Sequence, residues 1–161
     1  MKVKHTLEPF YDKDSLVLIL GTMPSVKSRE LGFYYMHPQN RFWHILEKVF
    51  KEKIDNDIDS KKEFLKKHHI ALWDVLESCN IDGSSDSSIK NIKVNNINKI
   101  IKNSNIKYIY TTGKKAYSLY NKYVLPKTNI EAICLYSPSP ANCAVKMESI
   151  VENYQVINKI K

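Results

Sequence analysis

The sequence predicts an α/β fold: a single-domain, three-layer sandwich in which helices cover both faces of a central four-stranded, mainly parallel sheet. Three observations carry this prediction. Short apolar runs typical of buried strands recur along the chain. Stretches with apolar residues at helical spacing lie between these runs. The length of 161 residues suits one core.

Four segments are predicted as strands. Residues 16–20 (LVLIL) are apolar throughout, as expected of a strand that is buried on both faces. Residues 70–75 (IALWDV), residues 108–111 and residues 130–136 (IEAICLY) are similarly short and rich in apolar residues. Because helical segments separate them, right-handed crossovers and parallel pairing are expected.

Five segments are predicted as helices. In the first, apolar side chains recur at the spacing of one helix face. Residues 82–88 (DGSSDSS) are predicted to form a loop from their Gly, Ser and Asp content. The predicted helices are residues 41–50, 61–67, 94–102, 114–123 and 147–158.

The composition favours a polyanionic partner. The formal charge is +8 and the pI is about 9.3, and lysine or arginine side chains that meet phosphates release condensed counterions. An equally weighted alternative is that lysine-rich runs such as KEKIDNDIDSKK only solvate the surface. No apolar run approaches the roughly 20 residues that span a bilayer, and MKVKHTLEPF has no signal-peptide core, so a cytoplasmic location is expected.

The cysteines do not indicate a metal or disulfide site. Cys79, Cys134 and Cys143 are odd in number, widely spaced and without a CxxC pair, which excludes the usual zinc and iron–sulfur patterns. Reduced and mostly buried thiols are expected, and no cofactor is predicted.

The segments that leave the predicted strands are rich in polar side chains. In a parallel sheet the carboxyl ends of the strands meet at one edge, where ligands bind. The segments are residues 21–25 (GTMPS), 74–78 (DVLES), 111–115 (TTGKK) and 137–142 (SPSPAN). The first of them opens a long loop that also holds three consecutive aromatic residues and the sequence HPQNRFW.

These segments carry a family resemblance. LILGTMPS, GFYYMHPQNRFW, IALWDVLES and SPSPAN, in this order and at these distances, resemble the uracil-DNA glycosylase superfamily, and most closely its hypoxanthine-DNA (deoxyinosine) glycosylase branch. The similarity runs over nearly the whole chain. It implies one domain over residues 1–161 that binds damaged DNA, flips a deaminated base out of the helix and hydrolyses its N-glycosidic bond in base excision repair.

The chain departs from the family in its first motif. Members usually place a water-activating Asp or a water-positioning Asn there, whereas this chain has Met23, which cannot orient a water molecule by hydrogen bonding. The resemblance therefore implies that the catalytic amide is that of Asn40, in HPQN. The second motif often carries a His that stabilises the departing base, and SPSPAN has none.

The resemblance also implies a base pocket. Tyr35 would stack on the flipped base, with Phe33 forming part of the wall. Asp74 would accept a hydrogen bond from the N1–H of hypoxanthine. The turn that contains Thr22 and Met23 would offer backbone N–H groups to the base or the sugar.

The phosphates around the extruded nucleotide would meet the loops at the same edge. No lysine stands where the family uses a nucleophile, so a monofunctional, water-dependent reaction without a Schiff base is expected. A metal-free monomer is expected. The residues predicted to contact DNA are Ser25, Lys27, Arg29, Lys114, Ser137, Ser139, Ala141 and Asn142.

Each predicted site residue also has a structural interpretation. Asn40 precedes a predicted helix and suits an N-cap. Tyr35 is open to interpretation as a core aromatic, and Asp74 as the partner of a basic neighbour. His37 suits a structural hydrogen bond in its turn. Ser137, Ser139 and the TTGKK segment are also interpretable as ordinary turn residues. Trp43 and Trp73 are expected in the core.

Two alternative functions remain open at this point. One is a uracil- or mismatch-preferring glycosylase of the same fold. The other is a nucleic-acid binder that has lost the chemistry. A Rossmann-type cofactor enzyme is disfavoured because no GxGxxG follows a predicted strand.

Overall fold

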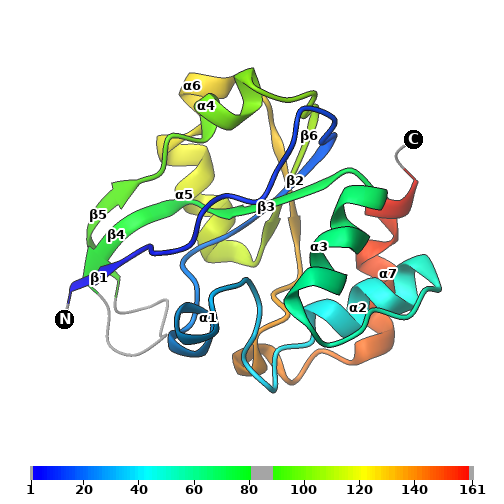
Figure 1. The fold of residues 1–161 in the computed structure, drawn as a ribbon. Helices are drawn as coiled ribbons and strands as arrows, with labels where there is room; N and C mark the ends of the chain where they lie inside the picture. Colours follow the sequence, from blue (N-terminus) through cyan, green and yellow to red (C-terminus); the bar gives the residue numbers. More distant parts are fainter. Residues whose placement is uncertain (1, 81–88, 160–161) are drawn as a thin grey trace.

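The computed structural model describes residues 2–80 and 89–159, so the predicted loop at residues 82–88 lies outside the described residues (Figure 1). The elements in chain order are β1 (Lys2–Lys4), β2 (Val17–Gly21), α1 (Val26–Leu31), α2 (Phe42–Phe50), α3 (Ile58–Lys67), β3 (Ile70–Asp74), β4 (Leu76–Asn80), β5 (Lys90–Val94), α4 (Ile97–Lys102), β6 (Tyr108–Thr112), α5 (Lys114–Tyr123), α6 (Leu125–Thr128), β7 (Ala132–Leu135), a 3-10 turn (Pro140–Asn142) and α7 (Met147–Asn158).

The predicted parallel sheet is confirmed. Its order is β3-β2-β6-β7, and all three pairings are parallel. The central strand β2 is buried along its whole length, which explains its uninterrupted apolar sequence. All four strands therefore end at the same edge, where the predicted site segments begin.

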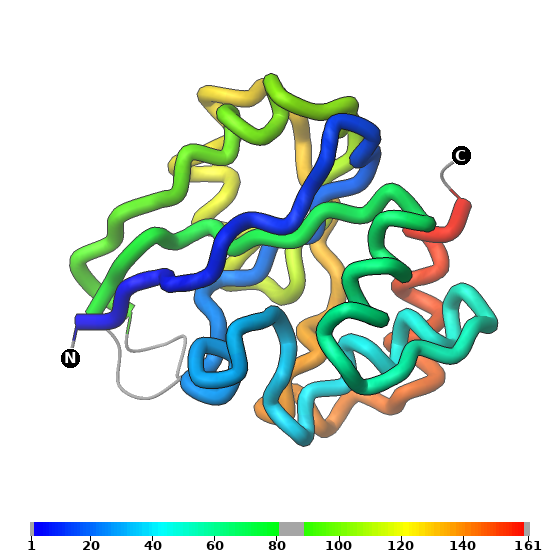
Figure 2. The backbone as a smooth tube through the Cα atoms, in the orientation of Figure 1, coloured from blue at the N-terminus to red at the C-terminus, as the bar shows by residue number. Residues whose placement is uncertain are grey.

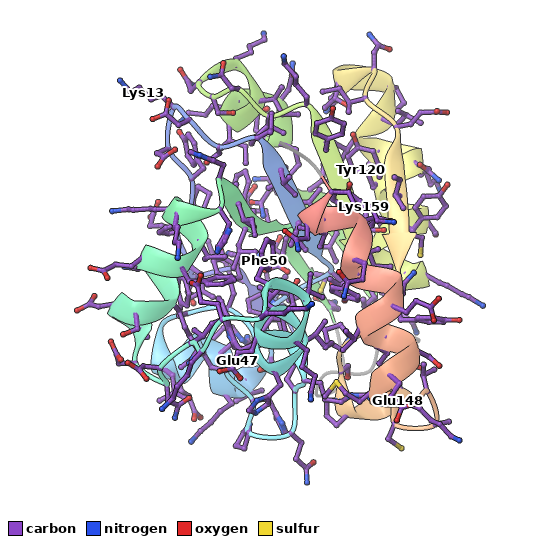
Figure 3. All side chains as sticks on the ribbon, turned by 90° about the vertical axis from the view of Figure 1, so that its right-hand side faces the viewer. Lys13, Glu47, Phe50, Tyr120, Glu148 and Lys159 are labelled. Carbon is purple, nitrogen blue, oxygen red and sulfur yellow. The ribbon has the colours of Figure 1, made fainter. Side chains whose placement is uncertain are left out.

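Helices cover both faces of this sheet, as predicted for a three-layer sandwich (Figure 1). Helices α2, α3 and α7 supply side chains to one apolar core, and α4 and α5 supply side chains to the other. Figure 3 shows the side of the molecule formed by α2, α3 and α7 and labels Phe50. The Phe50 ring packs edge-to-face on Phe64 of α3, with centroids 5.4 Å apart.

A second sheet, β1-β4-β5, is antiparallel and was not predicted. Residues 74–78, expected to leave the predicted strand at residues 70–75, include the start of β4. The amino-terminal segment runs beside β4 and β3 (Figure 2): Val3 lies opposite Cys79, and Phe10 forms a bridge with Leu72. This pairing brings the first residues of the chain to the carboxyl end of β3.

Several element boundaries differ from the predictions. The helix expected over residues 94–102 begins only at Ile97, because Val94 ends β5. The helix expected over residues 61–67 begins earlier, at Ile58, where the side chain of Asp57 accepts a hydrogen bond from the Ser60 N–H. The strand expected over residues 130–136 is shorter, and α1 and α6 were not predicted.

The cysteines lie in three different environments: Cys79 is buried, Cys134 is half-buried and Cys143 is exposed. Exposure of Cys143 departs from the expectation of mostly buried thiols. Over residues 2–80 and 89–159, no helix combines the length and apolarity needed to cross a membrane.

Candidate active site

Three neighbouring parallel strands end in small or polar residues that form the floor of the candidate site. Gly21 at the end of β2 lies opposite Asp74 at the end of β3. Thr112, at the end of β6, follows Thr111, which lies opposite Leu20. Because side chains alternate along a strand, Gly21, Asp74 and Thr112 face the same side of the sheet as Ile19.

Gly21 makes room for its neighbours. A Cβ atom on this residue would lie 2.5 Å from Asp74 Oδ1, 3.2 Å from the Tyr35 hydroxyl and 3.5 Å from Thr112 Oγ1. Three polar atoms from three separate segments thus surround one point above the sheet. Any side chain at this position would overlap the Asp74 carboxylate.

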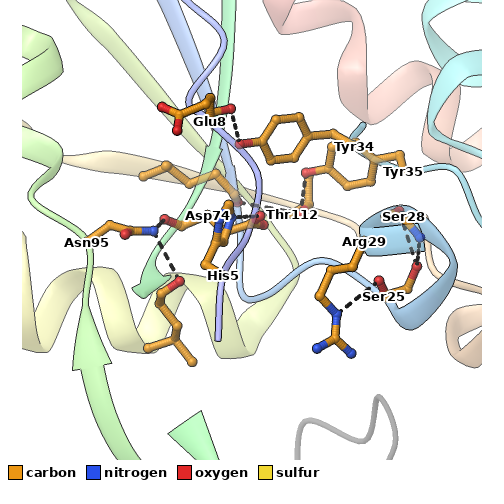
Figure 4. A network of polar contacts seen from close by, with 12 residues as sticks. His5, Glu8, Ser25, Ser28, Arg29, Tyr34, Tyr35, Asp74, Asn95 and Thr112 are labelled. Carbon is orange, nitrogen blue, oxygen red and sulfur yellow. Dashed lines mark hydrogen bonds and ion pairs between the residues drawn. The ribbon is translucent and has the colours of Figure 1, made fainter. Parts of the chain in front are cut away.

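Tyr35 closes one side of this floor (Figure 4). Its hydroxyl lies 3.2 Å from Thr112 Oγ1, and its ring stacks on Phe42 with centroids 3.9 Å apart. Its backbone has φ 56°, an uncommon left-handed conformation for an aromatic residue. Burial, followed by the nearby Asp74 charge, raises the pKa of Tyr35 well above its ordinary value, so it is a neutral phenol at physiological pH.

Asp74 is paired with His5, a residue without a predicted role. His5 Nε2 lies 2.8 Å from Asp74 Oδ2, and the two side chains are only 3% and 4% exposed. No hydrogen bond from residues 2–80 or 89–159 reaches the second carboxylate oxygen, Oδ1. The predicted pairing with a basic neighbour is confirmed, and one acceptor atom stays available beside Tyr35.

Asn40 combines a structural contact with an available donor. Its side-chain oxygen accepts a hydrogen bond from the Phe42 N–H at 2.9 Å, a turn contact two residues along the chain that satisfies the first N–H of α2. The N-cap of α2 is Arg41, which makes no side-chain capping bond, so the predicted capping role of Asn40 is wrong. Its side-chain NH2 group donates to no residue within the described ranges, and the residue is half-buried.

Arg41 joins the loop that carries Asn40 to the SPSPAN segment. Its guanidinium donates to the carbonyl oxygens of Val145 at 2.7 Å and Asn142 at 3.0 Å. Its backbone N–H donates to the Pro138 carbonyl at 3.0 Å. Three hydrogen bonds from one residue thus hold two loops together, although they are about a hundred positions apart in the chain.

We expect Arg41→Lys to lower the free energy of unfolding by about 1.5–3 kcal/mol, because a single ammonium nitrogen does not reproduce the two forked guanidinium nitrogens that donate to the two carbonyl groups. Chemical denaturation measures this change. Arg29→Lys is the matched control, since the Arg29 guanidinium makes only a 3.5 Å contact with the Ser25 carbonyl. Equal unfolding free energies for the Arg41 variant and the parent would contradict the bridging role.

Three residues predicted to contact the base have structural contacts of their own. Phe33 is 4% exposed and stacks on Trp43 with centroids 5.9 Å apart, inside the first core. Met23 packs against the second core, on the opposite face of the sheet. The carbonyl of Thr22 accepts a hydrogen bond from the Leu76 N–H. Their predicted contacts with a base stay predictions.

Both tryptophans lie where they were expected. Trp43 is 8% exposed, and Trp73 packs against both cores. His37 also has the predicted structural role, because its Nδ1 accepts a hydrogen bond from the Gln39 N–H at 3.1 Å.

The residues predicted to contact DNA occupy turns and helix starts. Ser25 caps α1, and Ser139 caps the 3-10 turn by accepting from the Ala141 N–H. The Ser137 hydroxyl accepts from the Ser139 N–H, and the Asn142 amide donates to the Ser137 carbonyl. These turn-forming roles are confirmed and DNA contact stays a prediction. Lys27, Lys114 and Ala141 are exposed, and Arg29 is half-buried.

Segments TTGKK and SPSPAN meet at the site edge, as their positions after parallel strands predicted. A Cβ on Gly113 would lie 3.2 Å from the Cβ of Ser137, and Gly113 has φ 100°. Glycine is needed here because its backbone is left-handed and its neighbour is close. Lys114 then begins α5.

Sequence reasoning missed His5 and Thr112, and it gave Arg41 no role of its own. Their contacts join segments that are distant in the chain, and no local pattern signals them. Within the described ranges, no group of three or more His, Cys, Asp or Glu side chains could hold a metal ion. A metal-free reaction stays a prediction.

Comparisons with known proteins agree on one family. A family model described as the Uracil DNA glycosylase superfamily matches residues 8–159. A Methanosarcina barkeri protein named hypoxanthine DNA glycosylase is 32% identical over 144 residues, which are 86% of this chain and 88% of that protein. A Methanosarcina acetivorans protein of the same name is 33% identical over 94 residues, 58% of this chain and 60% of that protein.

A solved structure has the same fold. The solution NMR structure of a uracil DNA glycosylase candidate from Methanosarcina acetivorans matches with a TM-score of 0.81 and 27% identity. The match covers 98% of this chain and 99% of that one.

Proposed function

Because the chain belongs to the uracil DNA glycosylase superfamily, we propose that it removes deaminated bases from DNA, with hypoxanthine in deoxyinosine as the preferred substrate. Family membership supports the coarser part, hydrolysis of the N-glycosidic bond in DNA. The names of the two Methanosarcina relatives support hypoxanthine as the base.

The observation that carries this proposal is the available oxygen of Asp74. Deamination of adenine turns a ring nitrogen that accepts a hydrogen bond, N1, into an N–H donor. An ionised carboxylate only accepts hydrogen bonds, so Asp74 Oδ1 would pair with hypoxanthine and leave adenine N1 facing another acceptor. A site that offers only an acceptor at this point selects the deaminated base over the normal one.

The neighbouring residues suit the remaining requirements of the reaction. Phe42 covers one face of the Tyr35 ring, and a flipped base would stack on the other face. Cleavage develops positive charge on the sugar and negative charge on the base. The Asn40 NH2 group, which the contact with the Phe42 N–H does not use, would hold water or contact the reacting nucleotide, and an amide needs no particular pKa for this.

Loops at the site edge would hold the DNA backbone. SPSPAN presents hydroxyl and amide groups, and Lys27, Arg29 and Lys114 add positive charge. The neutral Tyr35 and the absence of a nucleophilic lysine motif favour water as the nucleophile. The expected product is an intact abasic strand, without strand cleavage and without a Schiff base that borohydride could trap.

A panel of duplexes tests this function. Purified protein is incubated with otherwise identical duplexes that contain deoxyinosine, deoxyuridine, a G:T mismatch or only normal bases, and abasic sites are then cleaved with alkali. We expect the fastest cleavage at deoxyinosine and none in the normal duplex. An intact deoxyinosine strand beside a cut deoxyuridine strand would overturn the substrate proposal.

A preference for uracil is the second candidate function, and Asp74 Oδ1 also supports it. Deamination of cytosine gives uracil an N3–H donor, which Asp74 Oδ1 would also accept. The panel separates the two bases. A protein that binds all these duplexes and cleaves none would be a non-catalytic relative.

A further inference from the structure

We propose that His5 is a positioning residue for the base site: its hydrogen bond to Asp74 Oδ2 fixes the carboxylate so that Oδ1 faces the flipped base. The proposal rests on the proposed function and names a residue that the chain contributes from its amino-terminal segment. The family model matches residues 8–159, so His5 lies outside the matched segment.

The pair is built from two different sheets (Figure 4). His5 directly follows β1 of the antiparallel sheet, and Asp74 ends β3 of the parallel sheet. Their 2.8 Å contact is almost completely shielded from solvent. An ionised carboxylate only accepts, so the proton of this hydrogen bond is on His5 Nε2.

His5 is itself held in place. Its backbone N–H donates to the Glu77 carbonyl at 2.7 Å, which ties it to β4. Its ring meets Trp73 edge-on, with centroids 6.5 Å apart, and lies tilted against Tyr34 at 6.1 Å. A donor with a fixed backbone and a packed ring can fix the rotamer of its acceptor.

The arrangement around Asp74 leaves one direction for a ligand. His5 occupies Oδ2, and the backbone carbonyl of Asp74 accepts a hydrogen bond from the Asn95 amide at 3.0 Å. Oδ1 is the atom next to Gly21 and the Tyr35 hydroxyl. A rotation of the carboxylate away from His5 would move Oδ1 off this floor.

His5 also moderates the charge of the site. The departing base becomes negative, and an uncompensated carboxylate beside it would oppose bond cleavage. The titratable side chains that lie near Asp74 are His5, Tyr34 and Tyr35, and burial with the Asp74 charge raises the pKa of both tyrosines. The tyrosines therefore stay neutral, and His5 supplies the hydrogen bond that stabilises the carboxylate.

Single-turnover excision of hypoxanthine tests the role with two substitutions at one position. His5→Leu removes the donor at similar volume, and we expect a fall in rate of about 10- to 100-fold, the loss of one charge-assisted hydrogen bond. His5→Gln keeps a donor near the same place and should restore most of the rate. His68→Leu, at the end of α3 near the start of β3, is the control expected to match the parent.

A double-mutant cycle shows whether His5 acts through Asp74. In an Asp74→Asn background, His5→Leu should add almost no further loss, because the carboxylate it positions is already gone. The double variant buries no unpaired charge, so it is expected to fold even if His5→Leu alone does not, and a rate well below that of Asp74→Asn would then overturn the proposal. Thermal unfolding shows which variants are folded at the assay temperature.

Equal losses from His5→Leu in both backgrounds would overturn the proposal, as would a His5→Gln variant as slow as a folded His5→Leu. These outcomes leave the proposed function standing, because the parent protein still excises the base. A parent that excises neither hypoxanthine nor uracil would overturn the proposed function itself.

Discussion

Asn40→Ala is expected to lower the rate of hypoxanthine excision by about 10²- to 10³-fold, the usual effect of removing one donor from a reacting site. DNA binding should largely persist, because the phosphate contacts come from other loops. The same substitution removes the hydrogen bond that the Asn40 side chain accepts from the Phe42 N–H, so we also expect a loss of about 1 kcal/mol in the free energy of unfolding. Single-turnover kinetics and chemical denaturation measure the two effects.

Asn40→Ser separates these two roles. A serine hydroxyl can accept the same hydrogen bond from the N–H two residues along the chain, so it should replace the contact with the Phe42 N–H and restore stability. It lacks the amide NH2 group, so excision should stay as slow as in Asn40→Ala. A serine variant that excises at the parent rate would remove the Asn40 amide from the mechanism.

Asp74→Asn is expected to lower the rate of hypoxanthine excision by about 100-fold or more. A site binds a base poorly when a polar group of the site faces a like group of the base and has no hydrogen-bond partner. His5 Nε2 would still donate to the new amide oxygen, which directs the amide NH2 group toward the base. Two donors, this NH2 group and the hypoxanthine N1–H, would then face each other.

Uracil provides the control for Asp74→Asn. Its N3–H is also a donor, so excision of uracil should fall by a similar factor if Asp74 reads the N–H group that both bases share. Thermal unfolding should change little, since the His5 hydrogen bond is kept. Parent-like excision of hypoxanthine by this variant would contradict base reading by Asp74.

Much of the parallel sheet could be predicted because its signals are local. The apolar run at β2 reflects a strand buried on both faces, and the helical spacing of Phe42, Ile45 and Leu46 reflects one face of α2 packed in the core. The convergence of the four polar segments then follows from parallel topology alone. The position of the candidate site at this edge of the sheet is therefore predictable from local signals.

The second sheet could not be predicted for the opposite reason. Strand β1 has three residues, and β5 (KNIKV) is largely exposed. Neither has a periodic pattern, and both are strands only because β4 lies between them. The contact of His5 with Asp74 depends on this pairing across 69 positions, so no local feature of the sequence points to it.

Asn40 divides its side chain between a structural contact and a proposed catalytic one. Its position before a helix predicted a cap, which the structure gives to Arg41, and the family resemblance implied a catalytic amide. The oxygen accepts from the Phe42 N–H and the NH2 group is left for the proposed reaction, so the two contacts use different atoms. Sequence alone could not divide the amide in this way, because the orientation of the side chain depends on the loop that Arg41 holds.

The most direct test of the central claim is the single-turnover rate of base release from one duplex that contains deoxyinosine, measured for the parent protein and for Asn40→Ser side by side. We predict release of hypoxanthine by the parent, with an intact abasic strand as the other product, and a rate at least about 100-fold lower for the variant. No release by the parent, or equal rates for the two proteins, would contradict the account.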